Sequence, residues 1–390
     1  MRVSSRRWRG LLALTGVTAA LLAPSTASAA GATGRQAGPL ERQVDAIHDS
    51  GAVGVQAEVT SPDGRDSARA GTAEPGTGRQ MPHNGRMRIG SAAKTFTAAV
   101  VLQLVAEGSM SLDDKVERWL PGVVRGNGND GRRITVRQLL QHTSGIPDIL
   151  PEIASLNSAA GYRAERFRTY TPEELVALAM RKRRTFRPGQ GWSYSNTNYT
   201  LAAMIIHRVT GRSWEDEVKA RIISPLGLSG TSTPGTSPSV PGPHAHSYAT
   251  FGAGAGAGIG IDVTELNTSM AVGSGSIIST AHDLNRFYAA LLGGRLLAPA
   301  QLREMTTTVD APELGVRYGL GLGEITLSCG GSYFGHPGEL LGYHTWSGST
   351  RDGTRTAVVY TTSDGGENTQ AAIGRLVDEE LCHARSQGVS

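Results

Sequence analysis

The sequence is poor in several features that mark common protein classes. Its 390 residues include only four lysines and two cysteines, and aromatic residues make up 5% of the chain. No apolar stretch reaches the ~20 residues that a membrane-spanning helix needs, so we expect no membrane anchor. The patterns Gly-x-Ser-x-Gly, Gly-x-x-x-x-Gly-Lys and His-Glu-x-x-His are also absent. The sequence therefore predicts no metal and no organic cofactor.

Beyond the first nine residues, positive and negative side chains are equal in number, so neither sign of charge is in excess. The formal net charge is +4, and four arginines between residues 2 and 9 account for all of it. Such a balance gives no reason to expect nucleic-acid binding. The arginines precede an apolar run at residues 11–22 and the small residues Ala27-Ser-Ala29, the arrangement of an export signal. We predict a signal peptide at residues 1–29 and a secreted, extracellular protein, with the Sec and twin-arginine routes both open.

One stretch, Gly90-Ser-Ala-Ala-Lys-Thr-Phe96, combines a nucleophile with a base. Residues 86–90 are strand-like and residues 92–107 follow a helical pattern, so we expect Ser91 to cap a helix and Lys94 to lie one turn further along the same face. A serine hydroxyl needs a base, and a lysine can serve when burial keeps its amine neutral. The alternative is that the pair belongs to a solvated helix face.

Two more motifs carry side chains suited to the same chemistry. Tyr194-Ser-Asn196 follows a Pro-Gly turn and precedes a helix, so its side chains can project from a fixed loop. A phenol can relay protons or, as a phenolate beside Lys94, act as the base, and an asparagine can bind a substrate amide. The alternative for Tyr194 is a core tyrosine. His336-Pro-Gly338 is the weaker signal, because His-x-Gly also occurs at His83.

The order of strand and helix patterns predicts the fold class. A helix at residues 40–50 and a hairpin at residues 53–71 come first, and strand patterns return at residues 318–327, 344–349 and 355–362 before a final helix at residues 369–382. Between them lie helices at residues 135–141, 172–180, 198–209 and 214–223. We predict an α/β domain formed by residues 38–110 and 270–390, interrupted by a helical insertion domain at residues 111–269.

In this order the three motifs resemble those of the penicillin-recognising serine hydrolases, the serine β-lactamases and penicillin-binding proteins, and within them the secreted DD-carboxypeptidase and class C branch. Further similar stretches are Ile134-Thr-Val-Arg-Gln-Leu-Leu-Gln-His-Thr-Ser-Gly145 and Gly275-Ser-Ile-Ile-Ser-Thr280. The resemblance runs from about residue 50 to the C-terminus. It implies an antiparallel sheet flanked by helices, built from N- and C-terminal segments, with an inserted helical domain.

The resemblance also implies roles for individual residues. Ser91 would be acylated and then released by water, Lys94 and Tyr194 would share the proton transfers, and Asn196 would hold the acyl-side amide. In the third motif, His336 would stand where class C enzymes have lysine, two residues before Gly338. The backbone N–H of Glu339 would face that of Ser91 around the oxyanion.

The two cysteines, Cys329 and Cys382, are expected to form a disulfide in an exported protein. Two reduced core thiols are the alternative. The family resemblance agrees with the disulfide, since the secreted actinobacterial-type DD-carboxypeptidase joins the same strand region to its last helix.

The third motif departs from that carboxypeptidase. Where the carboxypeptidase has His-Thr-Gly-Thr, this sequence has His336-Pro337-Gly338-Glu339. In addition, residues 318–329 contain no arginine or lysine that could bind the terminal carboxylate of a peptide. Arg317 lies at the edge of this stretch and could substitute. From the resemblance we expect a D-alanyl-D-alanine carboxypeptidase or a close DD-peptidase relative, and these departures count against a true carboxypeptidase. The alternatives are a D-aminopeptidase, D-amino-acid amidase or esterase in which Glu339 binds a substrate ammonium group, and a penicillin-binding sensor or decoy that stays acylated.

The expected partners follow from this interpretation. They are a D-amino-acid-containing peptide or a related small acyl substrate, with β-lactams as acylating inhibitors. We expect no nucleic acid, and we expect a monomer.

Overall fold

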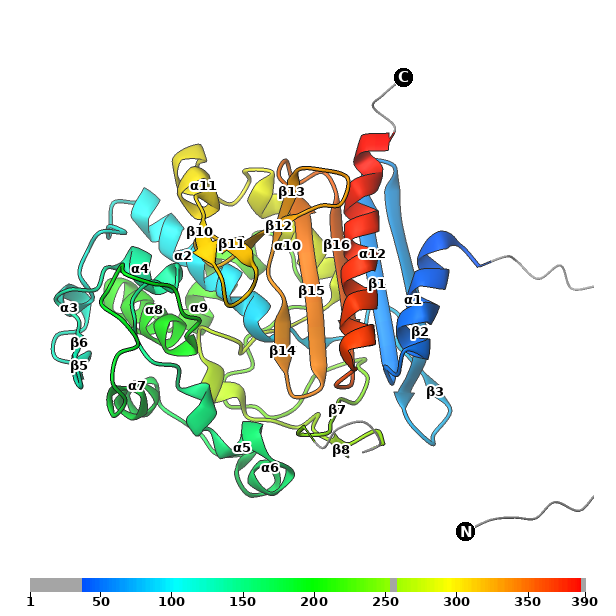
Figure 1. Ribbon diagram of the computed structural model, residues 1–390, viewed down its shortest axis with the longest axis horizontal. Helices are drawn as coiled ribbons and strands as arrows, with labels where there is room; N and C mark the ends of the chain where they lie inside the picture. The colour runs from blue at the N-terminus through cyan, green and yellow to red at the C-terminus, as the bar shows by residue number, and fades with distance from the viewer. Residues whose placement is uncertain (1–36, 253–257, 387–390) are drawn as a thin grey trace, which may run out of the picture. The chain divides into compact units, whose positions relative to one another are not determined.

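One antiparallel sheet organises the part of the chain that the structure, a computed structural model, describes: residues 37–252 and 258–386 (Figure 1). The predicted signal peptide lies outside these residues. Within them the sheet has ten strands in the order β10-β11-β12-β13-β15-β16-β1-β2-β3, and β14 pairs with β15. Strands from the two ends of the chain therefore meet at the centre of one sheet, as the sequence predicted.

The N-terminal segment forms one edge of this sheet. It contains α1 (Pro39–Asp49), β1 (Gly54–Ser61), β2 (Gly64–Glu74) and β3 (Arg79–Gln80). The predicted hairpin is confirmed, because β1 and β2 pair in register from Gly54 opposite Gly71 to Ser61 opposite Gly64.

The C-terminal segment supplies the remaining strands. They are β10 (Val309–Ala311), β11 (Val316–Tyr318), β12 (Gly323–Thr326), β13 (Ser332–Gly335), β14 (Gly338–Leu340), β15 (Tyr343–Thr350) and β16 (Thr356–Thr361). The single strand predicted at residues 318–327 is wrong, because the chain turns between β11 and β12. Gly321 takes φ +79° there, and a side chain at Gly319 would lie 2.1 Å from the Met305 carbonyl oxygen.

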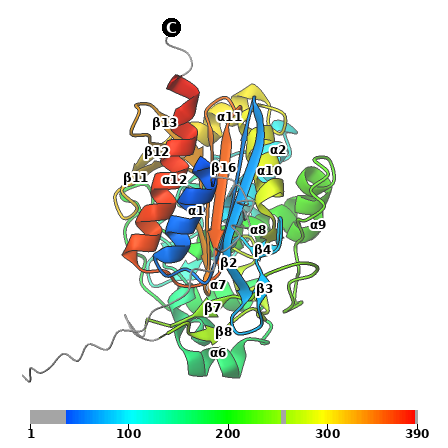
Figure 2. The same cartoon turned by 90° about the vertical axis from the view of Figure 1, so that its right-hand side faces the viewer.

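Helices cover both faces of the sheet (Figure 2). On β16, Ala357 and Val359 pack with α1 and α12 (Glu367–Ser386), whereas Val358 and Tyr360 belong to the cluster that includes α10 (Ala281–Leu292). Successive side chains point to opposite faces of a strand, so residues 357–360 are all apolar or aromatic because β16 is buried on both sides.

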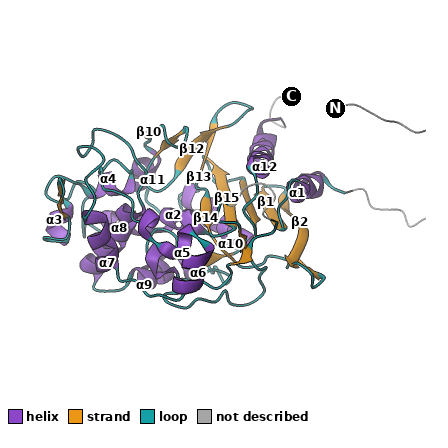
Figure 3. Ribbon diagram, turned by 60° about the horizontal axis from the view of Figure 1, so that its bottom comes forward, coloured by secondary structure: helices purple, strands orange, loops and turns teal. Residues whose placement is uncertain are grey.

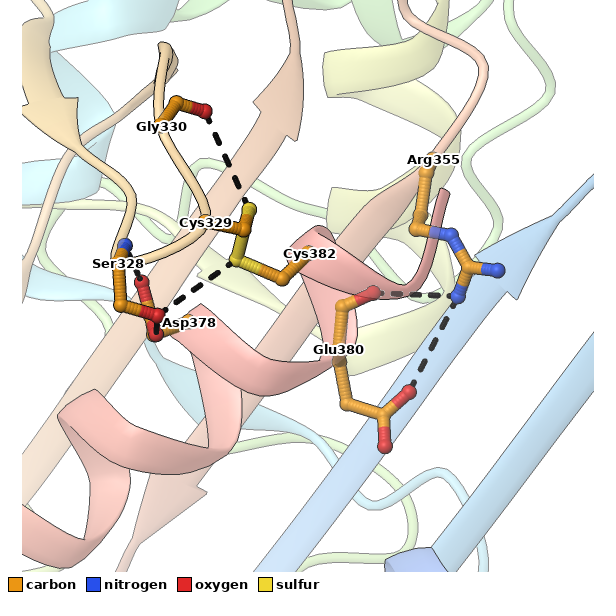
Figure 4. Close-up of a disulfide and its surroundings, with 7 residues drawn as sticks. All are labelled: Ser328, Cys329, Gly330, Arg355, Asp378, Glu380 and Cys382. Atoms are coloured by element: carbon orange, nitrogen blue, oxygen red, sulfur yellow. Dashed lines mark hydrogen bonds and ion pairs between the residues drawn. A yellow bond between two sulfur atoms is a disulfide. The ribbon is translucent and has the colours of Figure 1, made fainter. Parts of the chain in front are cut away.

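A disulfide between Cys329 and Cys382 ties the loop after β12 to α12, and this prediction is confirmed (Figure 4). Beside it, the backbone N–H of Ser328 donates to Asp378 on α12 at 2.8 Å. Both links fix the last helix against the sheet.

Most other helices gather beside the strands (Figure 3). They are α3 (Val116–Trp119), α4 (Val136–Leu140), α5 (Ala154–Asn157), α6 (Ala159–Glu165), α7 (Pro172–Met180), α8 (Asn196–Thr210), α9 (Trp214–Val218) and α11 (Pro299–Thr306). Short strand pairs join this region: β4 (Met87–Arg88) with β9 (Ile278–Ser279), β5 (Arg125–Gly126) with β6 (Asn129–Asp130), and β7 (Tyr248–Ala249) with β8 (Ile261–Asp262). The helices predicted between residues 135 and 223 are present, while the domain boundaries stay a prediction.

The helix α2 (Ala93–Ala106) lies between the sheet and these helices, and eleven of its fourteen residues are buried. A helix that is apolar on all sides belongs in an interior, and its start is thereby held in a fixed place. None of the described helices is both long and apolar enough to cross a membrane.

Candidate active site

The turn that carries Ser91 lies directly against β14. Gly90 takes φ +49°, which lets residues Gly90–Ala92 form a 3₁₀ turn ahead of α2. Ser91 therefore sits inside this turn, and the expectation that it caps the helix is wrong. A side chain at Gly90 would lie 2.5 Å from the Glu339 carbonyl oxygen, and one at Gly338 would lie 1.9 Å from the Ile89 carbonyl oxygen. Two glycines thus bring the backbones of Ser91 and Glu339 together, as a shared oxyanion hole would require.

Lys94 is completely buried beneath Ser91. Its amine lies 3.0 Å from Ser91 Oγ, 2.6 Å from Asn196 Oδ1 and 2.9 Å from the Ser274 carbonyl oxygen. Burial lowers the pKa of Lys94 to about 7, although the charge of Asp148 opposes the shift. Near neutral pH a large fraction of the amine is therefore unprotonated and can accept the Ser91 proton.

Tyr194 lies over the same pair. Its ring centroid is 4.8 Å from Lys94 Nζ. Burial raises the pKa of Tyr194 well above its usual value, and the nearby Ser91 hydroxyl only partly offsets this. The site therefore favours a neutral phenol that relays a proton over a phenolate that acts as the base.

Asn196, the first residue of α8, connects Lys94 to a carboxylate that sequence reasoning missed. Asn196 Oδ1 accepts from Lys94, while its backbone N–H donates to Asp148 Oδ1 at 2.9 Å and its Nδ2 lies 3.2 Å from Asp148 Oδ2. Asp148 thus fixes which way the Asn196 amide points. The predicted contact of Asn196 with a substrate amide remains a prediction. Asp148 follows the Ser144-Gly145 end of the stretch that carried the resemblance, and this position was the one signal available.

His142 lies in the same stretch and contacts the loop that carries Tyr194. Sequence reasoning missed this residue too. Its ring stacks on Tyr194 with centroids 4.3 Å apart, and its Nδ1 accepts from the Ser195 N–H at 3.1 Å. Burial lowers the pKa of His142 well below its usual value, so the ring stays neutral and Nδ1 stays free to accept. His142 also has φ +61°, a conformation that persists only where surrounding contacts hold it.

His336 lies between β13 and β14 and is 2% exposed. Its Nε2 is 2.9 Å from the Tyr318 hydroxyl, and its Nδ1 is 2.5 Å from the Pro337 carbonyl oxygen. Burial and the neighbouring Lys94 charge lower the pKa of His336 to about 3. The third motif therefore presents a neutral ring and not a cation.

The charged groups near this motif do not suit a substrate carboxylate. Arg317 is exposed and pairs with Asp310 at 2.6 Å, and it is next to Tyr318, whose hydroxyl reaches His336. Adjacent residues of a strand point to opposite faces, so the expectation that Arg317 substitutes for a carboxylate-binding arginine is wrong. The one charged side chain on β14 is the exposed Glu339. Among the described residues, no group of three His, Cys, Asp or Glu side chains is arranged to hold a metal ion.

The chain belongs to the Beta-lactamase family, whose sequence pattern matches residues 40–381. Among solved structures, a D-stereospecific amidohydrolase from Streptomyces sp. is 42% identical with a TM-score of 0.80, over 88% of this chain and 98% of that chain. The D-amino acid amidase from Ochrobactrum anthropi SV3, in complex with L-phenylalanine amide, is 27% identical with a TM-score of 0.77, over 89% of this chain and 98% of that chain.

Curated relatives include penicillin-binding proteins. Penicillin-binding protein 4* of Bacillus subtilis (strain 168) is 32% identical over 163 residues, which are 41% of this chain and 33% of the relative. The putative penicillin-binding protein PbpX of the same strain is 26% identical over 272 residues, 70% of this chain and 61% of the relative. The matches therefore span a third to three fifths of these relatives' lengths. Family, fold and the Ser91–Lys94 contact together define a serine hydrolase with the β-lactamase fold.

Proposed function

We propose that this chain hydrolyses amides of D-amino acids through an acyl-enzyme on Ser91. The observation that carries the proposal is the charge along β14, where Glu339 is exposed while His336, just ahead of the strand, is held neutral. An anion at this edge attracts a substrate ammonium group and repels a substrate carboxylate. The likeness to a D-stereospecific amidohydrolase and a D-amino acid amidase supports the same substrate class.

The geometry suits a two-step acyl transfer. Neutral Lys94 takes the Ser91 proton as Oγ attacks the amide carbonyl carbon, and the N–H groups of Ser91 and Glu339 stabilise the oxyanion. The proton then passes, with the Tyr194 hydroxyl as relay, to the departing nitrogen, which leaves as ammonia. A water molecule gives a proton to Lys94 and attacks the ester carbonyl. Lys94 then passes this proton to Ser91 Oγ as the ester bond breaks, which releases the D-amino acid and restores Ser91 and neutral Lys94.

A D-alanyl-D-alanine carboxypeptidase is the second candidate, and the named penicillin-binding relatives favour it. It requires a partner for the terminal carboxylate of the peptide. Arg317, the arginine nearest to the motif in sequence, is paired with Asp310, which weakens this candidate.

Parallel turnover assays test both candidates. We expect release of ammonia from D-alanine amide, slower release from L-alanine amide, and no turnover by the Ser91→Ala variant. Glu339→Gln should raise KM for D-alanine amide about tenfold, equivalent to ~1.4 kcal/mol, and should leave a neutral short-chain ester unaffected. Release of D-alanine from an acylated D-Ala-D-Ala peptide, with the amide inert, would replace the amidase proposal by the carboxypeptidase.

We also propose that β-lactams acylate Ser91. Intact-mass measurement should show one added β-lactam on the parent protein and none on Ser91→Ala. If the adduct forms and no amide, peptide or ester turns over, the chain is a penicillin-binding sensor or decoy and the hydrolase proposal fails.

Export through the signal peptide at residues 1–29 is likewise a proposal. Expression of the full chain in a secreting host, followed by N-terminal sequencing of the medium fraction, tests it. Cleavage after Ala29 or Ala30 supports export.

A further inference from the structure

A basic run, Arg181-Lys-Arg-Arg184, follows α7 and lies against the hairpin of β5 and β6 (Figure 1). Asn127, in the turn of the hairpin, donates from Nδ2 to the Met180 carbonyl oxygen at 2.8 Å and to that of Arg181 at 3.1 Å. Asn129 Nδ2 lies 3.1 Å from the Lys182 carbonyl oxygen. These bonds use carbonyl groups that the end of a helix leaves without partners. The basic run is therefore held in a fixed place on the hairpin.

A hollow with a volume of about 410 Å³ lies between these segments, and neither Ser91, Lys94 nor Tyr194 borders it. Ligand sites for small molecules fall between roughly 300 and 1,000 Å³, so the hollow has the size of a site for a small molecule. Two glycines of the hairpin leave space in its wall. The arginines that border it are Arg125, Arg132, Arg133 and Arg184.

Carboxylates neutralise only part of this positive charge. Arg132 donates to both oxygens of Asp130, each at 2.9 Å, and Arg125 pairs with Glu117. Arg133 lies 3.8 Å from the same Asp130 carboxylate, which Arg132 already occupies. Four arginines and two carboxylates leave a net charge of +2. The chain beyond its first nine residues is neutral as a whole, so this positive charge is a local excess.

Arg184 is the arginine best placed to bind a ligand. A side chain at Gly128 would lie 3.3 Å from Arg184 Nε and 3.4 Å from its Cδ, so Arg184 extends along the turn of the hairpin. Its side chain is only partly exposed, and no carboxylate of the described residues pairs with it. A guanidinium presents a planar fork of donors that matches the oxygens of a phosphate. Contact with the backbone limits the freedom of this side chain, which lowers the entropy cost of binding.

We propose that this hollow binds a small phosphate monoester, with Arg184 and Arg133 donating to the phosphate oxygens. A phosphate monoester carries close to two negative charges at neutral pH, which equals the excess positive charge of the walls. A phosphodiester carries only one and leaves part of that excess in place. The rest of the hollow holds the alcohol part of the ester, for which glycerol is a suitable size. This site is separate from the proposed hydrolase site and does not depend on it.

The test is isothermal titration calorimetry of the purified protein at constant ionic strength and neutral pH. The probes are glycerol 3-phosphate, inorganic phosphate and dimethyl phosphate. We expect saturable binding of glycerol 3-phosphate at one site, with dimethyl phosphate at least tenfold weaker because it carries a single charge. Dimethyl phosphate that binds as tightly as the monoester would overturn the match of charge. Inorganic phosphate that binds more tightly than glycerol 3-phosphate would overturn the assignment of an ester.

Charge-removing variants locate the binding. Arg184→Gln should weaken glycerol 3-phosphate at least tenfold, and Arg133→Gln, at an exposed position, should weaken it in the same direction. Arg295→Gln removes the same charge at an exposed position after α10 and is the matched control, which should bind like the parent protein. Ser91→Ala should also bind like the parent, so this test stands even where the hydrolase proposal fails.

Circular dichroism should show that each variant is folded. Absence of saturable binding to the parent protein would overturn the site. So would an affinity that is unchanged in both Arg184→Gln and Arg133→Gln, or a tenfold loss of affinity in Arg295→Gln.

Discussion

Replacing Asp148 by asparagine should shift the pH dependence of catalysis toward acid. Asp148 and Lys94 bind opposite ends of the Asn196 amide, which places their charges about 7 Å apart. Opposite unit charges at that distance attract by roughly 0.6 kcal/mol in water and 2.4 kcal/mol at an effective dielectric constant of 20. Since 1.36 kcal/mol corresponds to one pKa unit, loss of the charge should lower the pKa of Lys94 by about 0.4–1.8.

The amide at residue 148 keeps one oxygen for the Asn196 N–H, so the change removes the charge and keeps that hydrogen bond, while the NH₂ that replaces Oδ2 no longer accepts from Asn196 Nδ2. The assay is kcat/KM from pH 4 to 9 on a neutral ester, because an ammonium-bearing substrate would add its own titration. The ascending limb, which reports unprotonated Lys94, should move to lower pH by the stated amount. Asp63→Asn, in the exposed turn after β1, is the matched control and should not move it. A limb that stays in place or moves to higher pH in Asp148→Asn would refute the assignment of Lys94 as the base.

Three further changes test other parts of the structure. Lys94→Met should abolish acylation yet raise the free energy of unfolding at pH 7 by roughly 1–4 kcal/mol, because the lysine of the unfolded chain binds a proton more tightly than the buried lysine between pH 7 and 10.5. The extra stability of the variant should shrink as the pH rises through that window. Urea denaturation of both proteins at several pH values would measure it. Gly338→Ala should reduce acylation at least a hundredfold by pushing β14 off Ile89, and a β-lactam labelling rate equal to that of the parent would contradict this close approach. Cys382→Ser, which opens the bridge to Cys329 across 53 residues, should remove about 4 kcal/mol of stability and leave kcat unchanged at 25 °C; a loss of kcat in fully folded protein would show that α12 shapes the site.

The parts of the fold that could be predicted from sequence are those with long, regular patterns. The helix α2 and the strand β16 stand out as runs of mainly apolar residues, and the hairpin of β1 and β2 is marked by the turn residues Ser61-Pro-Asp-Gly64. All these signals come from residues that are neighbours in the sequence. The split between β11 and β12 could not be seen, because it depends on how closely Gly319 approaches Met305, a residue distant in sequence. A run of apolar residues gives no sign of such a contact.

In the candidate site, too, one contact could be predicted from the sequence and others could not. Ser91 and Lys94 are linked through one helical turn, so their spacing predicts their contact, which the structure contains. Asp148 and His142 act on Asn196 and Ser195 from 48 and 53 residues away. Neither carries a local pattern that distinguishes it from an ordinary loop residue, and only the tertiary structure gives them partners.

The meeting of Ser91 with β14 has a consequence for the order of events during synthesis. Ser91 and Lys94 leave the ribosome early, but Glu339 and the strand β16, which pairs with β1 at the centre of the sheet, come last. Contacts between distant segments form slowly, because a long loop must close before they bring any gain. A nascent chain therefore carries its serine without the second half of the oxyanion hole, and it should be inert to acylating compounds until the last strands have docked. Covalent labelling of Ser91 would then mark the moment at which folding is complete.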